Sequence, residues 1–267
     1  MSMLVSSALP AVTATAFNPP SIDEFFPDAF WFTGTPFAIN RILFVRIIAT
    51  LVLVLILAIS SRRVRLVPSR GQSMMEMSLG FIRTNIAEEI LGGNARKYVG
   101  LITTIFLGVF FMNISGIIPG LQIAGTSIIG MPLIYAVVAY VAFIVAGVKE
   151  QGWGGYFHSS LFPAGVPKAL YILLTPIEFF STFIIRPFTL TIRLLANMIS
   201  GHLLLVLCYV GTSFFFFEAA AKIKVLGVLT LGLGFAFVLF EIFVAALQAY
   251  IFALLTAVYI DLSISEH

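Results

Sequence analysis

The stretch Thr189-Leu-Thr-Ile-Arg-Leu-Leu-Ala-Asn-Met-Ile-Ser-Gly-His-Leu-Leu-Leu-Val-Leu207 is almost wholly apolar but contains one guanidinium, that of Arg193. From Leu194 to Phe217 the sequence has no Asp, Glu, Lys or Arg. A guanidinium at bilayer depth costs about 3 kcal/mol on insertion scales and more than about 10 kcal/mol in simulations. An arginine does not escape this cost by losing its proton at physiological pH. The stretch therefore predicts a membrane-embedded helix whose single charge is compensated by an anionic partner or a water-filled path.

The composition is that of an all-α polytopic membrane protein. Of the 267 residues, 60% are hydrophobic and only 10% are charged, whereas soluble domains have about 25% charged residues. We predict a single integral membrane domain over residues 39–267, after an external N-terminal tail over residues 1–38 that lacks the basic start of a signal peptide. The net charge of +3 does not indicate nucleic-acid binding, because the basic residues border the predicted spans. Cys208 is the only cysteine, which excludes a disulfide within the chain.

Five apolar segments are predicted to cross the membrane, at about 39–60, 99–118, 132–147, 170–217 and 225–260. The last two exceed the roughly 20 residues that an upright helix needs, so we expect them to be strongly tilted, bent or hairpinned. Residues 73–91 are too polar to span and predict an amphipathic helix on the cytoplasmic face. Residues 152–168, with their glycines and prolines, predict a cytoplasmic loop.

Basic residues determine the predicted orientation. Arg46 lies near one end of the first span, where its side chain is expected to extend to the membrane surface. Four arginines follow the other end of this span: Arg62, Arg63, Arg65 and Arg70. By the positive-inside rule, this loop is cytoplasmic and the N-terminus is outside. Five spans then place the C-terminus in the cytoplasm.

Polar residues on the last two spans lie along helix faces. On the fourth span they are three or four residues apart and share one face: Arg186, Thr189, Arg193, Asn197 and Ser200. Glu241 and Gln248 on the fifth span are seven residues apart and also share a face, while His202 lies off the Arg193 face. Intramembrane ionisable residues normally face a protein interior or an aqueous cavity. Because a carboxylate and an imidazole exchange protons and an arginine does not, the pattern predicts a proton path interrupted by a fixed positive charge.

Several segments resemble one known family. The run Ile192-Arg-Leu-Leu-Ala-Asn-Met-Ile-Ser-Gly-His202 resembles the signature helix of subunit a of bacterial F-type ATP synthases. The run from Glu241 to Phe252 resembles that family's last helix. The other matching segments are Met112–Pro119, Leu161–Pro163 with Pro167, and Pro176–Glu178. The resemblance extends from about Met74 to the C-terminus, and the combination of Arg193 and Asn197 with Glu241 and Gln248 makes it specific.

This resemblance implies a non-catalytic, proton-conducting stator subunit of the Fo sector, which forms two half-channels against a ring of c subunits. Arg193 matches the arginine that faces the ion-carrying carboxylate of the ring. Asn197 and Gln248 match polar residues that flank this arginine and line the proton path. His202 and Glu241 match a pair in the outer half-channel, with the two residue types exchanged relative to many members of the family. Glu178 matches an acidic residue associated with the inner half-channel.

The same resemblance implies the partners of the chain. They are the c-subunit ring, the b-subunit peripheral stalk, the F1 sector through the rest of the complex, and a lipid bilayer. We expect the bilayer to be a bacterial plasma membrane, because no transit peptide precedes the chain. Nucleotide chemistry belongs to other subunits, and without a Gly-rich phosphate loop this chain is expected to bind no nucleotide, cofactor or metal. The predicted ion is a proton, with sodium as the alternative.

Two other classes of membrane protein compete with this interpretation. A secondary transporter predicts paired repeats around a midplane substrate site, and the two halves of this sequence show no convincing repeat. An intramembrane protease predicts a Ser-His pair, two aspartates or a zinc motif, and the three histidines, His158, His202 and His267, form no zinc motif. As structural residues, Asn197 and Gln248 would instead link helices at about 0.6 kcal/mol each, and His202 would be a hydrogen-bonded core histidine.

Overall fold

The computed structural model describes residues 27, 29, 31, 34, 38–62, 70–118, 121, 123–162, 167, 170–218 and 223–265. These residues form helices, apart from turns and one isolated antiparallel bridge between Trp31 and Ile39. The all-α prediction is confirmed. Most of the predicted N-terminal tail, together with Arg63, Arg65 and His267, lies outside the described residues, and the division at residue 38 stays a prediction.

In the described part of the chain, five helical segments are long and apolar enough to cross a membrane, as predicted. The first is α1, Arg41–Arg62; the second ends with α4, Ala95–Ile114; the third is α5, Gly130–Leu161. The fourth, Tyr171–Glu218, consists of α6 (Tyr171–Phe179), a π-helical stretch (Phe180–Ile185), α7 (Arg186–Ser213) and a second π-helical stretch (Phe214–Glu218). The fifth is α8, Val225–Ser265, which continues five residues beyond its predicted end.

A helical segment is present where the amphipathic helix was predicted, and its place on the cytoplasmic face stays a prediction. It consists of α2 (Arg70–Ile82), a π-helical stretch (Arg83–Glu88) and α3 (Glu89–Leu91). Gly92, with a φ of 51°, then turns the chain into α4, and residues with a side chain rarely adopt this backbone conformation. Ile82 and Ile86 are fully buried in a cluster with residues of α4 and α8, whereas Met74 is 70% exposed. The helix therefore packs on the bundle with its C-terminal half.

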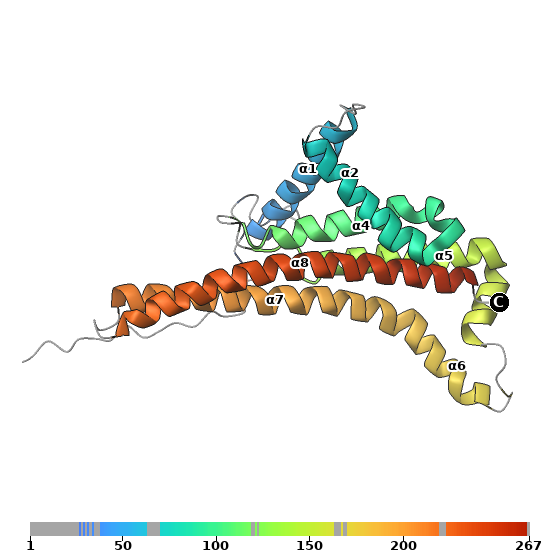
Figure 1. Ribbon diagram of the computed structural model, residues 1–267. Coiled ribbons are helices and arrows are strands. Elements are labelled where there is room, and N and C mark those ends of the chain that lie inside the picture. Colours follow the sequence, from blue (N-terminus) through green and yellow to red (C-terminus); the bar gives the residue numbers. More distant parts are fainter. Residues whose placement is uncertain are drawn as a thin grey trace, which may run out of the picture.

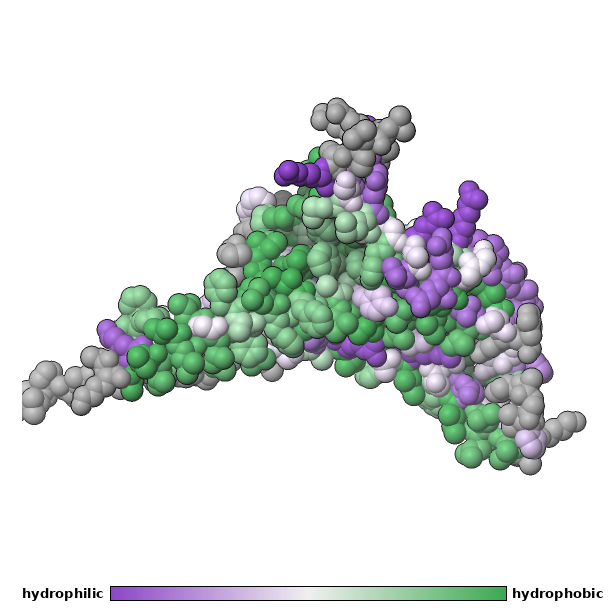
Figure 2. All heavy atoms as spheres, in the orientation of Figure 1, coloured by the Kyte–Doolittle hydropathy of each residue, from purple (hydrophilic) through white to green (hydrophobic). Residues whose placement is uncertain are grey.

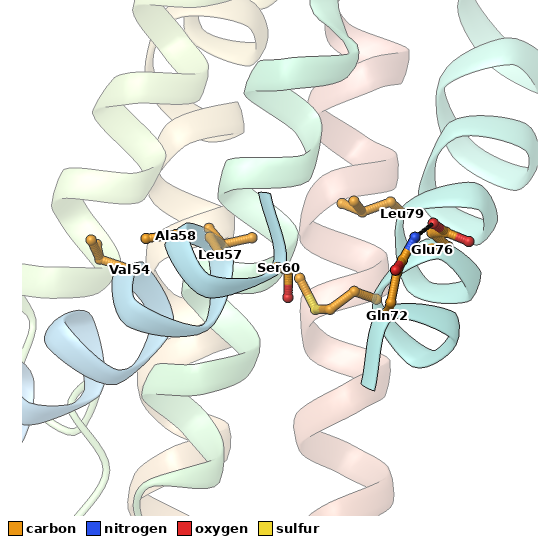
Figure 3. A pocket seen from close by; sticks show the side chains of 8 residues that line it. Val54, Leu57, Ala58, Ser60, Gln72, Glu76 and Leu79 are labelled. Carbon is orange, nitrogen blue, oxygen red and sulfur yellow. Dashed lines mark hydrogen bonds between the residues drawn. The ribbon is translucent and has the colours of Figure 1, made fainter. Parts of the chain in front are cut away.

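A groove of about 550 Å³ lies between α1 and α2 (Figure 3). Its walls are mainly apolar, with Val54 and Leu57 on α1 and Leu79 on α2. On the α2 side, Gln72 donates a hydrogen bond from Nε2 to Oε1 of Glu76 at 2.7 Å. Many of the exposed side chains of α1 are apolar as well, which is typical of a helix that faces lipid.

The prediction of a loop at residues 152–168 is wrong for residues 152–161, which are helical. Helix α5 breaks at Gly152, whose φ is 75°, and continues as a second helical segment to Leu161. Gln151 donates from Nε2 to the backbone oxygen of Ser263 on α8 at 3.0 Å, and Ser159 donates from Oγ to Oε1 of Gln151 at 2.6 Å. The first of these hydrogen bonds fastens the end of α5 to the end of α8, and the second holds the two segments of α5 together across the break, where sequence composition alone indicates a loop.

This junction requires a glycine at position 147. A Cβ there would overlap the buried ring of Tyr156 and would lie 3.0 Å from the backbone oxygen of Ser263. We expect Gly147→Ala to lower the melting temperature of the purified protein, since overpacking costs about 1–3 kcal/mol. Gly100→Ala is the matched control, because its Cβ would meet nothing within 4 Å and alanine is favoured in helices. Equal melting temperatures for the two variants would contradict the prediction.

Helices α7 and α8 form a long antiparallel hairpin (Figure 1). The 41 residues of α8, at about 1.5 Å each, give a length of about 60 Å. The hydrocarbon core is only about 30 Å thick, so this helix must be strongly tilted to stay at bilayer depth. Pro176 and the adjoining π-helical stretch bend the chain between α6 and α7. Figure 1 shows the resulting arch, which is concave on the side away from α4 and α5.

The core of the bundle lies between α8 and the helices α4, α5 and α7. On α8 four alanines are fully buried, at intervals of four residues: Ala245, Ala249, Ala253 and Ala257. Small residues allow helix backbones to approach closely inside a membrane. Helix α8 therefore packs tightly at the centre of the bundle, and Glu241 and Gln248 lie at the margin of its buried face, both half-buried.

Candidate functional site

His202 on α7 and Glu241 on α8 line one small cavity. The cavity has a volume of about 10 Å³, and its other lining residues are Asn113, Gly116, Ile117, Ala124 and Met198. The walls therefore come from α7, α8, the end of α4 and the segment that follows α4. A volume of this size is close to the minimum that holds one water molecule. The structure thus brings together the two residues for which the sequence predicted a shared path.

The approach of Glu241 to α7 depends on Gly201. A Cβ at position 201 would overlap Oε1 of Glu241, so the carboxylate lies directly against the backbone of α7, next to His202. The sequence places Gly201 inside the segment that resembles the family's signature helix, but predicts no role for it. A glycine carries no side chain that could mark it as functional, and only the contact across the hairpin identifies its role.

The segment after α4 packs over the cavity through polar contacts. Gly125 donates from its backbone N–H to the carbonyl of Met112 at 3.0 Å and to Oγ of Ser115 at 3.2 Å. Thr126 donates from Oγ1 to Oδ1 of Asn113 at 2.7 Å. Asn113 and Thr126 are both almost completely buried. These residues form a buried polar layer that the sequence prediction did not include in the site.

The half-buried side chain of Arg46 donates from Nε to the carbonyl of Gly125 at 2.7 Å and from Nη2 to that of Ile128 at 3.4 Å. Its extension to the membrane surface stays a prediction. Charge-assisted hydrogen bonds of this kind are stronger than neutral ones. They compensate the guanidinium inside the protein and fasten α1 to the segment that covers the cavity.

The contacts between α7 and α8 follow one register. Because the two helices are antiparallel, a residue that lies n positions further toward the C-terminus of α7 contacts a residue n positions nearer the N-terminus of α8. Three contacts define it, the last being a hydrogen bond of 3.0 Å between hydroxyls: Gly201 with Glu241, Cys208 with Gly234, and Thr212 with Thr230.

The same register gives the height of Arg193 on the hairpin. Seven residues before Gly201 it pairs Leu194 with Gln248, and Leu194 lies in one buried cluster with Ala249. Gln248 is therefore within one residue of the level of Arg193. Glu241 is level with Gly201, eight residues along α7 from Arg193, which at 1.5 Å per residue is about 12 Å.

The side chain of Arg193 lies on the exposed face of α7, together with those of Thr189 and Ser200. Leu190 and Leu194 form the buried face of this part of the helix. Within the described part of the chain, no acidic side chain forms an ion pair with Arg193. Figure 2 shows hydrophilic residues along part of the concave lower edge of the molecule, within a largely apolar surface. Because an unpaired guanidinium at bilayer depth is costly, the geometry leaves open the two forms of compensation expected from the sequence, an anionic partner or a water-filled path.

Asn197 lies one turn beyond Arg193 and is half-buried. Its Nδ2 atom is buried, and among the described residues it has no hydrogen-bond partner. An amide that linked two helices would donate such a bond. The structural interpretation of Asn197 as a link between helices is therefore not supported by this geometry.

Glu178 lies apart from the other predicted site residues. It is half-buried on α6, fifteen residues before Arg193, which corresponds to about 22 Å along the helix. Glu241 lies on the opposite side of Arg193 along the hairpin. Between Glu178 and Arg193, the guanidinium of Arg186 lies 5.1 Å from the ring centroid of Tyr259 on α8, a cation–π contact rather than an extension into solvent.

The fold and the site together define a polytopic helical membrane protein with ionisable groups spread along one tilted helix hairpin. The guanidinium of Arg193 lies on the exposed face of α7, an imidazole and a carboxylate share a cavity on one side of it, and a second carboxylate lies on the other side. The fixed charge of Arg193 thus lies between groups that can in principle accept and release protons: His202 and Glu241 on one side, and Glu178 on the other.

Comparison with known proteins identifies the family. The family model described as ATP synthase A chain matches residues 42–261. ATP synthase subunit a of Rhodococcus erythropolis is 45% identical over 259 residues, covering 96% of this chain and 94% of that protein. Subunit a of Frankia alni is 36% identical, covering 94% and 88%, and that of Paenarthrobacter aurescens is 34% identical, covering 97% of both. The chain belongs to the ATP synthase A chain family, as its resemblance predicted.

Proposed function

We propose that this chain is the proton-conducting stator subunit of the Fo sector of an F-type ATP synthase. It is a non-catalytic subunit that forms two half-channels against a c-subunit ring and couples proton flow to rotation of the ring and to ATP synthesis in F1. The observation that carries the proposal is Arg193, an exposed guanidinium without an ion-pair partner in the described part of the chain. The His202–Glu241 cavity lies on one side of it and Glu178 on the other.

In this mechanism a proton enters from outside past His202 and Glu241 and neutralises a carboxylate on a c subunit. The neutral subunit rotates into the lipid, because its charge no longer opposes transfer into hydrocarbon. After nearly a full turn the carboxylate releases the proton into the inner half-channel, past Glu178. Each proton supplies about 2.3 kcal/mol per 100 mV of membrane potential.

Arg193 keeps the two half-channels separate. Its positive charge attracts the deprotonated ring carboxylate and repels a proton that would otherwise cross directly. Asn197 and Gln248 flank it, one turn along α7 and level with it on α8. Both side chains are half-buried, so they can contribute amide dipoles to the path without closing it.

The remaining assignments concern orientation and partners. The chain is a multi-pass protein of a bacterial cell membrane, with the N-terminus outside and the C-terminus in the cytoplasm, and it assembles with the b-subunit peripheral stalk. Exposed basic residues support this orientation, because Arg62, Arg70 and Arg96 lie at the ends of α1, α2 and α4 that are assigned to the cytoplasm. Lys97 of α4 pairs with Glu150 of α5 at 3.0 Å on the same side.

The direct test is purification through a tag on this chain. We expect a c-subunit ring and b subunits to copurify, and the complex in vesicles to make ATP from an imposed pH gradient and potential. Repeating the measurement with and without added sodium distinguishes the two ions, since a proton-driven complex needs no sodium. A tagged chain that reaches the membrane intact but brings down no c subunit would exclude the proposal.

Gly201→Val provides a test inside the hairpin. The added side chain displaces the carboxylate of Glu241 from α7, and a misplaced group in a reaction path costs up to about a hundredfold in rate. We expect passive proton conduction by vesicles stripped of F1 to fall at least about tenfold. Gly232→Val is the control, because a Cβ at Gly232 on α8 meets nothing within 4 Å. Similar conduction in the two variants would show that the position of Glu241 does not matter.

A further inference from the structure

Two guanidiniums lie along the same face of α7, and their surroundings differ. Arg186 and Arg193 are seven residues apart, which puts them on one side of the helix, about 10 Å apart along its axis. Arg193 is exposed, whereas Arg186 is half-buried. Among the described residues, neither of them forms an ion pair with an acidic side chain. The group that compensates Arg186 inside the protein is an aromatic ring of α8.

This ring is that of Tyr259. The Cζ atom of Arg186 lies 5.1 Å from the centroid of the ring, which is within the range of a cation–π contact. Arginine is well suited to such a contact, because its planar guanidinium is weakly hydrated and stacks on aromatic faces. The attraction increases as the two groups lose water, and both side chains are half-buried. The contact therefore holds the guanidinium of Arg186 against α8.

The core of the bundle fixes the orientation of the Tyr259 ring. The ring packs edge to face with Phe143 of α5, with centroids 6.1 Å apart and planes at 65°. Phe143 is only 2% exposed, and its own ring packs against Tyr140. In the described part of the chain, Tyr259 takes part in hydrogen bonds through its backbone and not through its hydroxyl. The face of the ring, rather than the hydroxyl, is therefore the part of Tyr259 that contacts Arg186.

We propose that Tyr259 is a positioning residue for Arg186, and that it holds this guanidinium against α8, away from the carboxylates of the c-subunit ring. The inference rests on the proposed function, in which Arg193 is the residue that attracts the deprotonated ring carboxylate. A second free guanidinium on the same face would attract that carboxylate too, because opposite charges interact strongly where water is scarce. A carboxylate bound two turns away from Arg193 would slow the rotation of the ring.

Three substitutions test this restraint by ATP synthesis in reconstituted vesicles, at equal amounts of assembled complex. Tyr259→Leu keeps an apolar side chain but removes the ring face. We expect synthesis to fall about fivefold, since loss of a half-buried cation–π contact changes the ratio of held to released guanidinium by a factor of this order. Tyr259→Phe keeps the ring face and should retain the wild-type rate. Tyr250→Leu is the matched control, because this half-buried tyrosine of α8 packs on Phe81 and should also be replaceable.

Removal of the charge separates restraint from packing. Arg186→Gln deletes the cation, and we expect near wild-type synthesis from this variant both alone and combined with Tyr259→Leu. If Tyr259 only filled space, the double variant would stay as slow as Tyr259→Leu, and the inference would be overturned. Slow synthesis in Arg186→Gln alone would overturn it as well, because the charge itself would then be required. Slow synthesis in Tyr259→Phe, or normal synthesis in Tyr259→Leu, would have the same consequence.

Two further measurements keep these outcomes distinct. Tyr259→Met, whose flexible side chain adapts to irregular space, replaces the leucine variant if leucine prevents assembly, and the same results are expected of it. Arg193→Ala is measured in parallel. Continued synthesis in that variant would remove the proposed function itself, whereas loss of synthesis there combined with a slow double variant would remove only the restraint by Tyr259.

Discussion

Arg193→Ala is expected to abolish coupled ATP synthesis while the complex remains assembled. The side chain is exposed on α7, so its removal deletes a charge without opening a void in the core. Loss of a group that stabilises developing charge costs at least about a hundredfold in rate. The measurement is ATP synthesis by reconstituted vesicles, normalised to the amount of c-subunit ring that copurifies. Thr189→Ala, one turn away on the same exposed face, is the matched control and should keep its activity.

Arg193→Lys is expected to fail almost as completely. A lysine ammonium is a compact charge without the planar fork of a guanidinium, and it loses its proton more readily when desolvated. The alanine variant should also leak protons without rotation, because no fixed charge then separates the half-channels. Normal synthesis rates in an assembled alanine variant would exclude the stator assignment.

The membrane-spanning helices could be predicted from the sequence because long apolar segments are typical of such helices. The exceptions occur where long-range contacts decide the local structure. The second helical segment of α5 is fastened by Gln151 to the backbone of Ser263, a partner 112 residues away along the chain. Glycines and prolines near residue 152 indicate a loop, and no local pattern reveals that α8 ends beside them. The acceptors of Arg46, Gly125 and Ile128, likewise belong to another segment and could not be identified from its local sequence.

The charged residues of the candidate site could be predicted from the sequence, whereas the residues that pack around them could not. Charged and amide side chains stand out in an apolar run, so Arg193 and Glu241 could be selected from the sequence alone. The pairing of His202 with Glu241 was expected only from the family resemblance, and its physical basis is the register of the antiparallel hairpin, in which Glu241 lies against Gly201. Asn113 was missed as a site residue because its place in the cavity wall depends on how distant helices pack together, which no local sequence pattern shows.

Substitutions of His202 and Glu241 are expected to have non-additive effects, because the two side chains line the same cavity. Residues that share a site show coupling in a double-mutant cycle, whereas distant residues do not. We expect Glu241→Gln to slow proton uptake by at least about tenfold, the scale of a lost proton-transfer group. His202→Gln should have the smaller effect, because only the carboxylate carries a negative charge that attracts protons.

The exchanged double variant, His202→Glu with Glu241→His, is expected to recover more activity than either of its single changes. Each single change leaves two groups of the same type facing one cavity, two carboxylates in one case and two imidazoles in the other. Like charges at such a distance oppose each other's ionisation, whereas the exchanged pair restores one group of each type. The measurement is ATP-driven proton pumping in inverted vesicles for both single variants and the double, at matched assembly. Strictly additive losses in that cycle would show that the two residues act separately, and the shared outer half-channel would then have to be abandoned.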